Sequence, residues 1–164
     1  MNARDAIRIA LQATHGMLNS YVSDLSDADL LVRPVPNANH IAWQLGHLIS
    51  AEVGLLGPVL PGLVPVPLPP GFKEQHDKAT ASIDPPKGFL TKSEYLNLFN
   101  QAREATIAAV NKLSDADLDK PTSGSMAKFA PTLGALLLLQ SNHVLMHGGQ
   151  FTVVRRKLGK PVLF

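Results

Sequence analysis

Two histidines spaced four residues apart are the feature of this sequence that most directly suggests chemistry. His143 and His147 lie within QSNHVLMHGGQ. On a helix, this spacing places both imidazoles on one face, one turn apart, where they can share a metal ion. The spacing alone has low specificity, because a chain with six histidines can contain such a pair by chance. Val144 and Leu145 follow His143, so the HExxH motif of zinc proteases is absent.

A third histidine, His47, lies within WQLGHLI between apolar residues. A histidine in that setting is often a structural residue at the boundary of the core. The alternative is that helix packing brings its ring to face His143 and His147. Three imidazoles in that arrangement form a site that leaves coordination positions for water or substrate, as catalytic rather than structural sites do.

Two further residues could assist such a site. His15 lies between Leu11 and Leu18 and could be a fourth ligand, a hydrogen-bond donor or general base behind the ligands, or a buried structural histidine. Gln150 follows His147 by three residues and shares its helix face. It could hydrogen-bond a ligand or a metal-bound water, or be an ordinary polar residue. We therefore consider His15 and Gln150 to be candidate catalytic residues.

Other polar residues and two glycines near these positions are expected to play lesser roles. We expect His40 to be a surface residue at the start of a helix, His76 to be solvated in the polar loop KEQHDK, and Glu52 to be a carboxylate behind the ligands or on the surface. Gly148 and Gly149 destabilise a helix relative to alanine. Their presence beside His147 suggests close approach by another helix or by substrate.

A basic cluster of Arg155, Arg156, Lys157 and Lys160 ends the last helical segment. Cations at a helix C-terminus interact favourably with the helix dipole, which explains the cluster without any ligand. An anchor for an anionic cosubstrate is the alternative.

The elements that must position these residues are helices. Four segments show the apolar spacing of amphipathic helices. They run from about Ala3 to Val22, from Asn39 to Leu56, from Thr91 onward, and from Thr132 to Lys157. The third begins with TKSE, a capping box in which Thr91 and Glu94 bond each other's backbone amides. No segment alternates with the period of a strand, so we expect an all-α four-helix bundle, with residues 1–164 in a single domain.

Two connecting features add to this plan. LSDADL occurs as Leu25–Leu30 and as Leu113–Leu118, where Ser26 and Ser114 can cap a short helical turn. Independent use of the same capping residues would explain the repeat, and the alternative, which we favour, is two related helix–loop–helix halves. The segment 57–71 contains six of the 13 prolines and predicts an extended strap. Its Val and Leu residues could pack on the bundle, roof a cleft or contact a second subunit.

Composition excludes several classes of protein. The chain has no cysteine, so it contains neither disulfides nor thiolate metal sites. A net charge of +2 and an aromatic content of 5% do not suit a nucleic-acid-binding face. The longest apolar run is too short to span a bilayer. We expect a cytoplasmic protein without nucleic-acid or membrane partners, and a homodimer.

The two histidine segments together resemble a known family. IAWQLGHL, and TLGALLLLQSNHVLMHGGQ in the fourth helix, are similar to the DinB/YfiT-like superfamily of metalloenzymes. The resemblance covers nearly the whole chain. It implies a variant of the up-and-down bundle and a divalent metal ion, nickel or zinc, held by three histidines. Carried over by position, the ligands are His47, His143 and His147, and Gln150 matches the family's following glutamine.

The resemblance does not determine the reaction. Some similar proteins are thiol-dependent S-transferases, and our first hypothesis is an enzyme of this kind that acts on a small molecule with a low-molecular-weight thiol. The absence of cysteine suits a thiol brought by a cosubstrate, and it suits hydrolysis equally. A metal-dependent hydrolase with the same site is one alternative. A non-catalytic helical binding or assembly module with structural histidines is another.

Overall fold

The computed structural model describes residues 1–163, with every side chain in that range except that of Ser125. Its elements follow in the order α1 (Ala3–Val22), α2 (Asp27–Leu30), α3 (Ile41–Leu56), α4 (Phe72–Gln75), η1 (Lys78–Thr80), α5 (Lys92–Lys112), α6 (Asp115–Leu118), η2 (Gly124–Lys128) and α7 (Leu133–Lys157). Within this range there is no strand, only an isolated β-bridge between Pro121 and Thr132. The expected all-α class and the four long helices are therefore confirmed.

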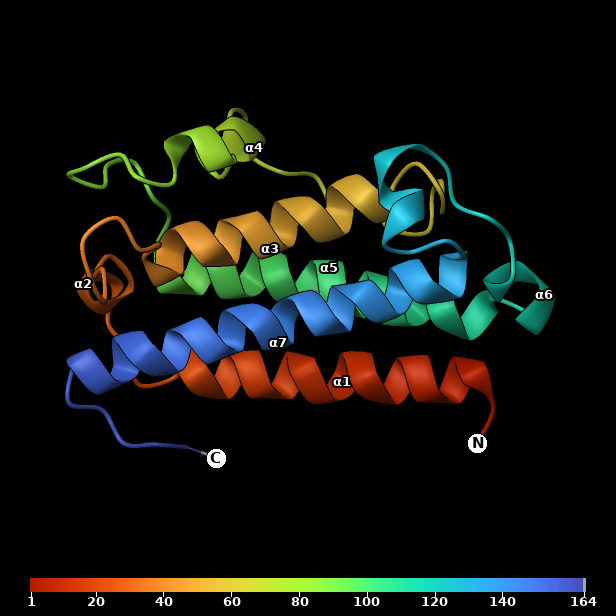
Figure 1. The fold of residues 1–164 in the computed structure, drawn as a ribbon, viewed down its shortest axis with the longest axis horizontal. Helices are drawn as coiled ribbons and strands as arrows, with labels where there is room; N and C mark the ends of the chain where they lie inside the picture. Colours follow the sequence, from red (N-terminus) through yellow and green to blue (C-terminus); the bar gives the residue numbers. More distant parts are fainter. Residues whose placement is uncertain (164) are drawn as a thin grey trace.

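The four long helices form a bundle in which α1 packs against α5 and α7, and α3 packs against α5 and α7 (Figure 1). α1 and α7 run in one direction and α3 and α5 in the other (Figure 1). The parallel pair α3 and α5 needs a long crossover, which residues 57–91 supply. Because α3 and α7 are antiparallel, the early part of α3 lies beside the later part of α7. This arrangement brings the histidine segments together.

Local sequence signals explain where the helices begin. The Thr91 side chain accepts from the amide of Glu94, whose carboxylate accepts from the amide of Thr91, as the capping box predicts. The two copies of LSDADL form matching capping boxes at Ser26 and Ser114, which start α2 and α6. Each copy turns the chain between two bundle helices. Sequence equivalence therefore corresponds to equivalent position in the fold.

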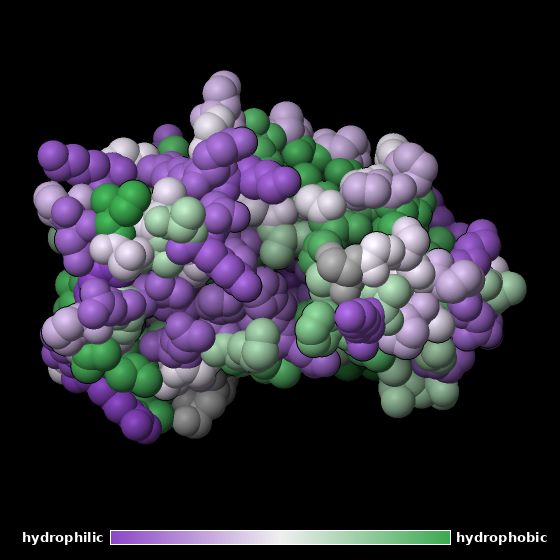
Figure 2. All heavy atoms as spheres, turned by 45° about the horizontal axis from the view of Figure 1, so that its top comes forward, coloured by the Kyte–Doolittle hydropathy of each residue, from purple (hydrophilic) through white to green (hydrophobic). Residues whose placement is uncertain are grey.

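The proline-rich strap packs on the bundle. Leu60 and Val64 are buried in one hydrophobic cluster, and Leu63 and Val66 pack partly against it. Figure 2 shows hydrophilic side chains over the left and middle of one face of the molecule, and a more continuous apolar surface toward the right. The right is the end at which the strap leaves α3 (Figure 1). Of the three roles expected for the strap, packing on the bundle is confirmed.

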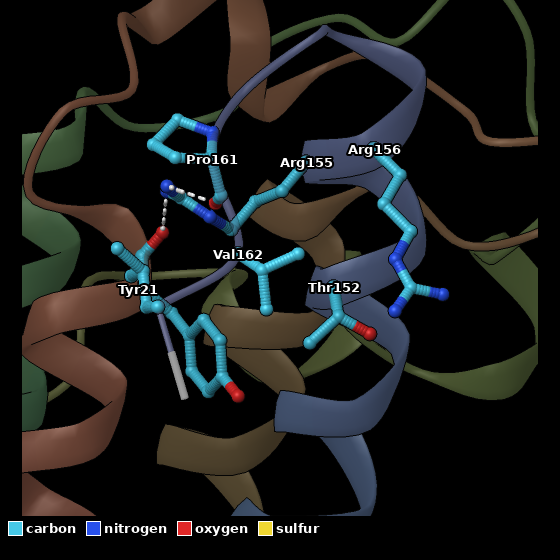
Figure 3. Close-up of a pocket in the computed structure, with 7 residues that line it drawn as sticks. Tyr21, Thr152, Arg155, Arg156, Pro161 and Val162 are labelled. Atoms are coloured by element: carbon cyan, nitrogen blue, oxygen red, sulfur yellow. Dashed lines mark hydrogen bonds between the residues drawn. The ribbon is translucent and has the colours of Figure 1, made fainter.

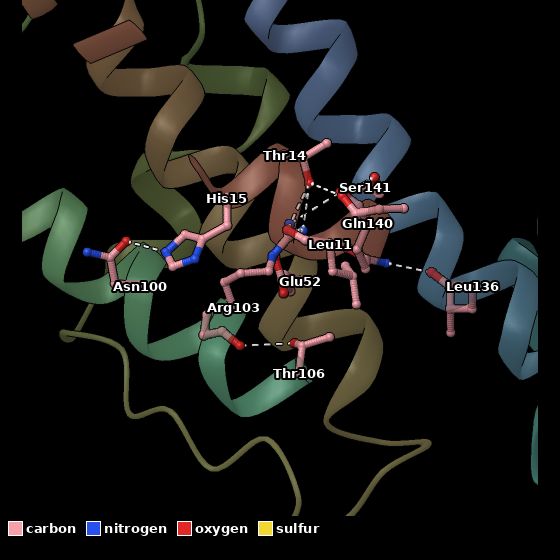
Figure 4. A network of polar contacts seen from close by, with 12 residues as sticks. Leu11, Thr14, His15, Glu52, Asn100, Arg103, Thr106, Leu136, Gln140 and Ser141 are labelled. Carbon is pink, nitrogen blue, oxygen red and sulfur yellow. Dashed lines mark hydrogen bonds and ion pairs between the residues drawn. The ribbon is translucent and has the colours of Figure 1, made fainter. Parts of the chain in front are cut away.

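The described residues form two hydrophobic core clusters. A layer of buried polar side chains, drawn in Figure 4, separates the two clusters along the helices. In this layer the guanidinium of Arg103 on α5 binds the carboxylate of Glu52 on α3 at 2.8 Å, and both side chains are buried. Arg103 also donates to Thr14 Oγ1 and to the carbonyl of Leu11, both on α1. It also donates to the carbonyl of Gln140 on α7, so the layer ties all four bundle helices together at mid-height. Among residues 1–163, no helix has the length and apolar character needed to cross a membrane.

Candidate metal centre

His47 on α3 and His143 and His147 on α7 converge in the contact between these two helices. One potential ligand atom from each side chain lies within 4.8 Å of the others. Nε2 of His147 is 3.2 Å from Nε2 of His143. His147 is buried, whereas His47 and His143 are half-buried, so solvent can reach the latter two rings. The three imidazoles therefore form a group that a small ligand could approach from outside.

The orientation of His147 is set by Gln44, one turn before His47 on α3. Nδ1 of His147 donates to Oε1 of Gln44 at 2.7 Å, and Nε2 of Gln44 donates to the carbonyl of Asn39 at 2.9 Å. Because the amide is held at both ends, its oxygen must face the imidazole. A proton on Nδ1 leaves the Nε2 lone pair of His147 directed toward the other two rings, as metal-binding histidines require.

His47 is held from two sides. Its ring stacks on Trp43 with centroids 4.9 Å apart and planes 8° apart. Its Nδ1 lies 3.4 Å from the backbone carbonyl of His76. A carbonyl can only accept a hydrogen bond, so this contact favours a proton on Nδ1 and leaves Nε2 free to bind an ion.

His76 is buried, with 1% of its surface exposed, so the expectation of a solvated loop residue was wrong. Its Nδ1 lies 2.6 Å from the carbonyl of Phe72 and its Nε2 lies 2.7 Å from the hydroxyl of Tyr95. The ring lies against Gly46, where an added Cβ would be 2.1 Å from Cδ2 of His76. Glycine at this position therefore lets the α4 segment approach α3 and place its carbonyl beside His47.

The three candidate ligands are poised to be neutral. Burial lowers the pKa of His143 to about 4, with the neighbouring His47 adding to the effect. Burial and the two neighbouring imidazoles lower the pKa of His147 to about 3. Burial also lowers the pKa of His47. Neutral imidazole is the form that binds metal ions, so no proton has to leave at neutral pH.

The structure gives the two candidate catalytic residues different surroundings. Nε2 of His15 lies 2.7 Å from Oδ1 of Asn100 on α5, and Asn19 donates to the same oxygen. Figure 4 shows the His15 ring directed toward Asn100. Gln150 is exposed on α7. Their catalytic roles stay predictions, and the structure gives His15 a partner in the contact between α1 and α5.

Several lesser expectations are corrected by the structure. His40 does begin α3, where Nδ1 accepts from the amide of Trp43, but it is buried rather than on the surface. Glu52 is neither exposed nor beside the histidines, because it pairs with Arg103 in the polar layer. Both were misjudged because helix packing, rather than local sequence, buries them.

The paired glycines after His147 differ from each other. A Cβ on Gly148 would lie 2.9 Å from Cε of Met17, so close approach by α1 is confirmed there. Within residues 1–163, a Cβ on Gly149 would meet nothing within 4 Å, so close packing among these residues does not explain that glycine.

The basic cluster at the end of α7 mostly binds protein groups. Arg155 is buried and pairs with Asp24, and it donates to the carbonyls of Tyr21 and Pro161 (Figure 3). Lys157 donates to the carbonyls of Arg33 and Pro34. These contacts hold neighbouring segments against the end of α7, which favours a structural role for Arg155 and Lys157.

The residues present fit a divalent metal ion. Three neutral nitrogen donors from two rigid helices match the histidine-rich sites that nickel and zinc occupy in proteins. Hydrogen-bond acceptors behind His47 and His147 complete the arrangement. Sequence inspection missed both acceptors. Gln44 had a usable signal, because it lies three residues before His47 on the same helix face, whereas His76 had none.

Comparisons with known proteins agree with the histidine motifs. A model of the DinB superfamily matches residues 10–151, a span that contains all three candidate ligands. A comparison with curated protein sequences found no significant match. Since the matched span is most of the chain, the protein belongs to the DinB superfamily.

Proposed function

We propose that this protein is a metal-dependent enzyme whose divalent ion, nickel or zinc, is held by His47, His143 and His147. The convergence of three neutral imidazoles carries the proposal. Gln44 and the carbonyl of His76 bind Nδ1 of His147 and of His47, whereas Nε2 of His143 and Nε2 of His147 face each other at 3.2 Å. A bound ion would accept the lone pairs that these rings turn toward one another. It would supply Lewis acidity, which lowers the pKa of a thiol or water that reaches it.

The chain's own residues prepare the site. Gln44 keeps the proton of His147 on Nδ1, and the carbonyl of His76 favours the same arrangement in His47. Trp43 covers one face of the His47 ring. These contacts hold the donor atoms in place before any ligand arrives, which reduces the cost of binding.

Thiol transfer is the reaction that we propose, with a low-molecular-weight thiol as cosubstrate. Among the described residues, the cluster that could hold an ion contains no carboxylate. Hydrolysis commonly uses a protein base to take a proton from water. A thiol starts from a pKa of about 8.5, whereas water starts from about 15.7, so a smaller shift produces a thiolate than a hydroxide. A thiol therefore depends less than water on a protein base, and the absence of a carboxylate from the cluster favours thiol transfer.

Metal content is the first test. Untagged protein, purified without a nickel column, would be analysed by elemental mass spectrometry beside His143→Ala, with His15→Ala as the matched control. We expect near-stoichiometric metal in the parent and in His15→Ala, and none in His143→Ala, with helical circular dichroism retained in all three. A parent that neither carries nor takes up nickel or zinc would instead indicate a non-catalytic helical module.

The reaction class is tested next with metal-loaded protein. An electrophilic substrate would be supplied with and without an added thiol, with His143→Ala as the inactive control. Product that forms only with the thiol supports transfer. Equal turnover of an ester without thiol would identify a hydrolase instead.

A further inference from the structure

A cavity of about 270 Å³ lies beside the histidine cluster, between α3 and the α4 segment. Along α3 it is lined by His47, Ser50, Ala51, Gly54 and Leu55. These positions follow the spacing of one helix face, so the cavity extends for about 12 Å along α3 from His47. Pockets for drug-sized molecules start at about 300 Å³. This one suits a smaller organic molecule.

Gly54 has no structural reason to be glycine. It lies inside α3, where glycine is less stable than alanine. A Cβ added to it would meet no atom of the described residues within 4 Å, and its backbone does not adopt a positive φ. Its position on the cavity wall offers a reason, because any larger side chain there would take up space in the cavity.

The polar groups of the cavity indicate what it binds. Oγ of Ser50 is buried and has no hydrogen-bond partner among the described residues. At the α4 side, Lys73 and Asp77 also line the cavity. Asp77 keeps its negative charge, but its Oδ1 is directed to the amide of Ala79, where it caps η1. No hydrogen bond or ion pair within residues 1–163 engages the ammonium group of Lys73, so it is available to an anion.

We propose that this cavity binds a small organic anion, with its apolar chain along Gly54 and Leu55 and its anionic group at Lys73. Ser50 forms part of the wall between His47 and Gly54. The idea that this molecule is the substrate rests on the proposed function, since His47 forms part of the wall. Anion binding itself does not require the metal.

The test uses three probes of equal chain length: hexanoate, hexanol and hexylamine. Binding to the protein as isolated and to chelator-treated protein would be measured by NMR titration. We expect hexanoate to bind about tenfold more tightly than hexylamine, with hexanol between them. Lys73→Gln should weaken hexanoate binding about threefold and leave hexanol binding unchanged, as for a partly exposed ion pair.

Gly54→Leu tests the location. We expect it to weaken binding of hexanoate and hexanol about tenfold or more, while zinc affinity stays at the parent value. Gly16→Leu is the matched control, because Gly16 is a helical glycine on α1 whose Cβ would also meet nothing within 4 Å. Hexanoate binding that survives Gly54→Leu, or equal binding of hexylamine and hexanoate, would overturn the proposal.

The two proposals fail separately. Protein that binds hexanoate in a Gly54-dependent way but takes up no nickel or zinc would retain the anion site and lose the proposed function. Protein that binds zinc through the three histidines but binds hexanoate no better than hexylamine would retain the metal site of the proposed function and lose the anion site.

Discussion

Gln44 and His147 form a hydrogen bond of 2.7 Å across the contact between α3 and α7. The amide of Gln44 is fully buried, and its other end donates to the carbonyl of Asn39. This arrangement makes Gln44 a positioning residue for the proposed metal site, because it sets which nitrogen of His147 carries the proton.

Replacing Gln44 by leucine should weaken zinc binding by about 10–100-fold, the usual effect of losing a hydrogen-bond partner behind a metal-binding histidine. Gln44→Glu keeps an acceptor for His147 and should bind zinc much more tightly than Gln44→Leu. Competition with a chromophoric chelator measures the affinities of both variants and of the parent. If the Gln44→Leu variant and the parent protein bind zinc with equal affinity, Gln44 does not act through His147.

Gly46 and His76 are packed too closely for any side chain at position 46. A Cβ there would be 2.1 Å from Cδ2 of the buried His76 ring. Gly46→Ala should therefore lower the free energy of unfolding by about 1–3 kcal/mol, as overpacking does. Urea denaturation monitored by circular dichroism would measure the change.

The His76→Ala background isolates the cause of this destabilisation. In the absence of the His76 imidazole, Gly46→Ala should lower the free energy of unfolding only slightly, because the added Cβ no longer clashes with that ring. Gly54→Ala is the control within the same helix and should stabilise it by up to about 1 kcal/mol. If Gly46→Ala lowers the free energy of unfolding by the same amount with and without His76, the packing argument is contradicted.

Features set by local sequence were predictable, and those set by the path of the chain were not. The capping box at Thr91 and the four-residue spacing of His143 and His147 are local, and both are found as expected. The prediction that His47 lies close to His143 and His147 needed the family resemblance in addition to the local sequence. The burial of His76 depends on how the chain crosses between α3 and α5, which no short segment encodes.

The polar layer shows the same limit. Arg103 was not singled out from the sequence, although it is fully buried. Its partner Glu52 lies 51 residues away in the chain, so only the packing of α3 against α5 reveals the pair. A charged residue on an otherwise apolar helix face was the signal that could have suggested it.

The Glu52–Arg103 pair gives a stability prediction. Arg103→Met leaves the carboxylate of Glu52 buried without its partner, so it should lower the free energy of unfolding by about 3–5 kcal/mol. The double variant Arg103→Met/Glu52→Leu should cost less than the sum of the two single changes, because neither charge is left unpaired. Urea denaturation of the parent, the two single variants and the double variant tests this, and simple additivity would show that the two groups do not interact.

Zinc binding should depend less on pH between pH 7 and pH 5 than it would with three ordinary imidazoles. A proton competes with a metal ion for an imidazole nitrogen only when the pH falls toward the pKa of that ring. Burial lowers the pKa of His143 to about 4 and of His147 to about 3, and it lowers the pKa of His47. Rings with the ordinary pKa of about 6.5 would lose affinity steeply below that pH.

The same shifts determine how stability changes with pH in the metal-free protein. The unfolded chain takes up protons below about pH 6.5, whereas the folded rings of His143 and His147 resist them until about pH 4 or lower. The unfolded state therefore gains protons first, and stability falls as the pH drops through this window.

Chelator competition at pH 7, 6 and 5, with circular dichroism to verify folding, tests the prediction about the pH dependence of zinc binding. A loss of zinc affinity by orders of magnitude between pH 7 and pH 5, in protein that stays folded, would show that the histidines are not held in the neutral form.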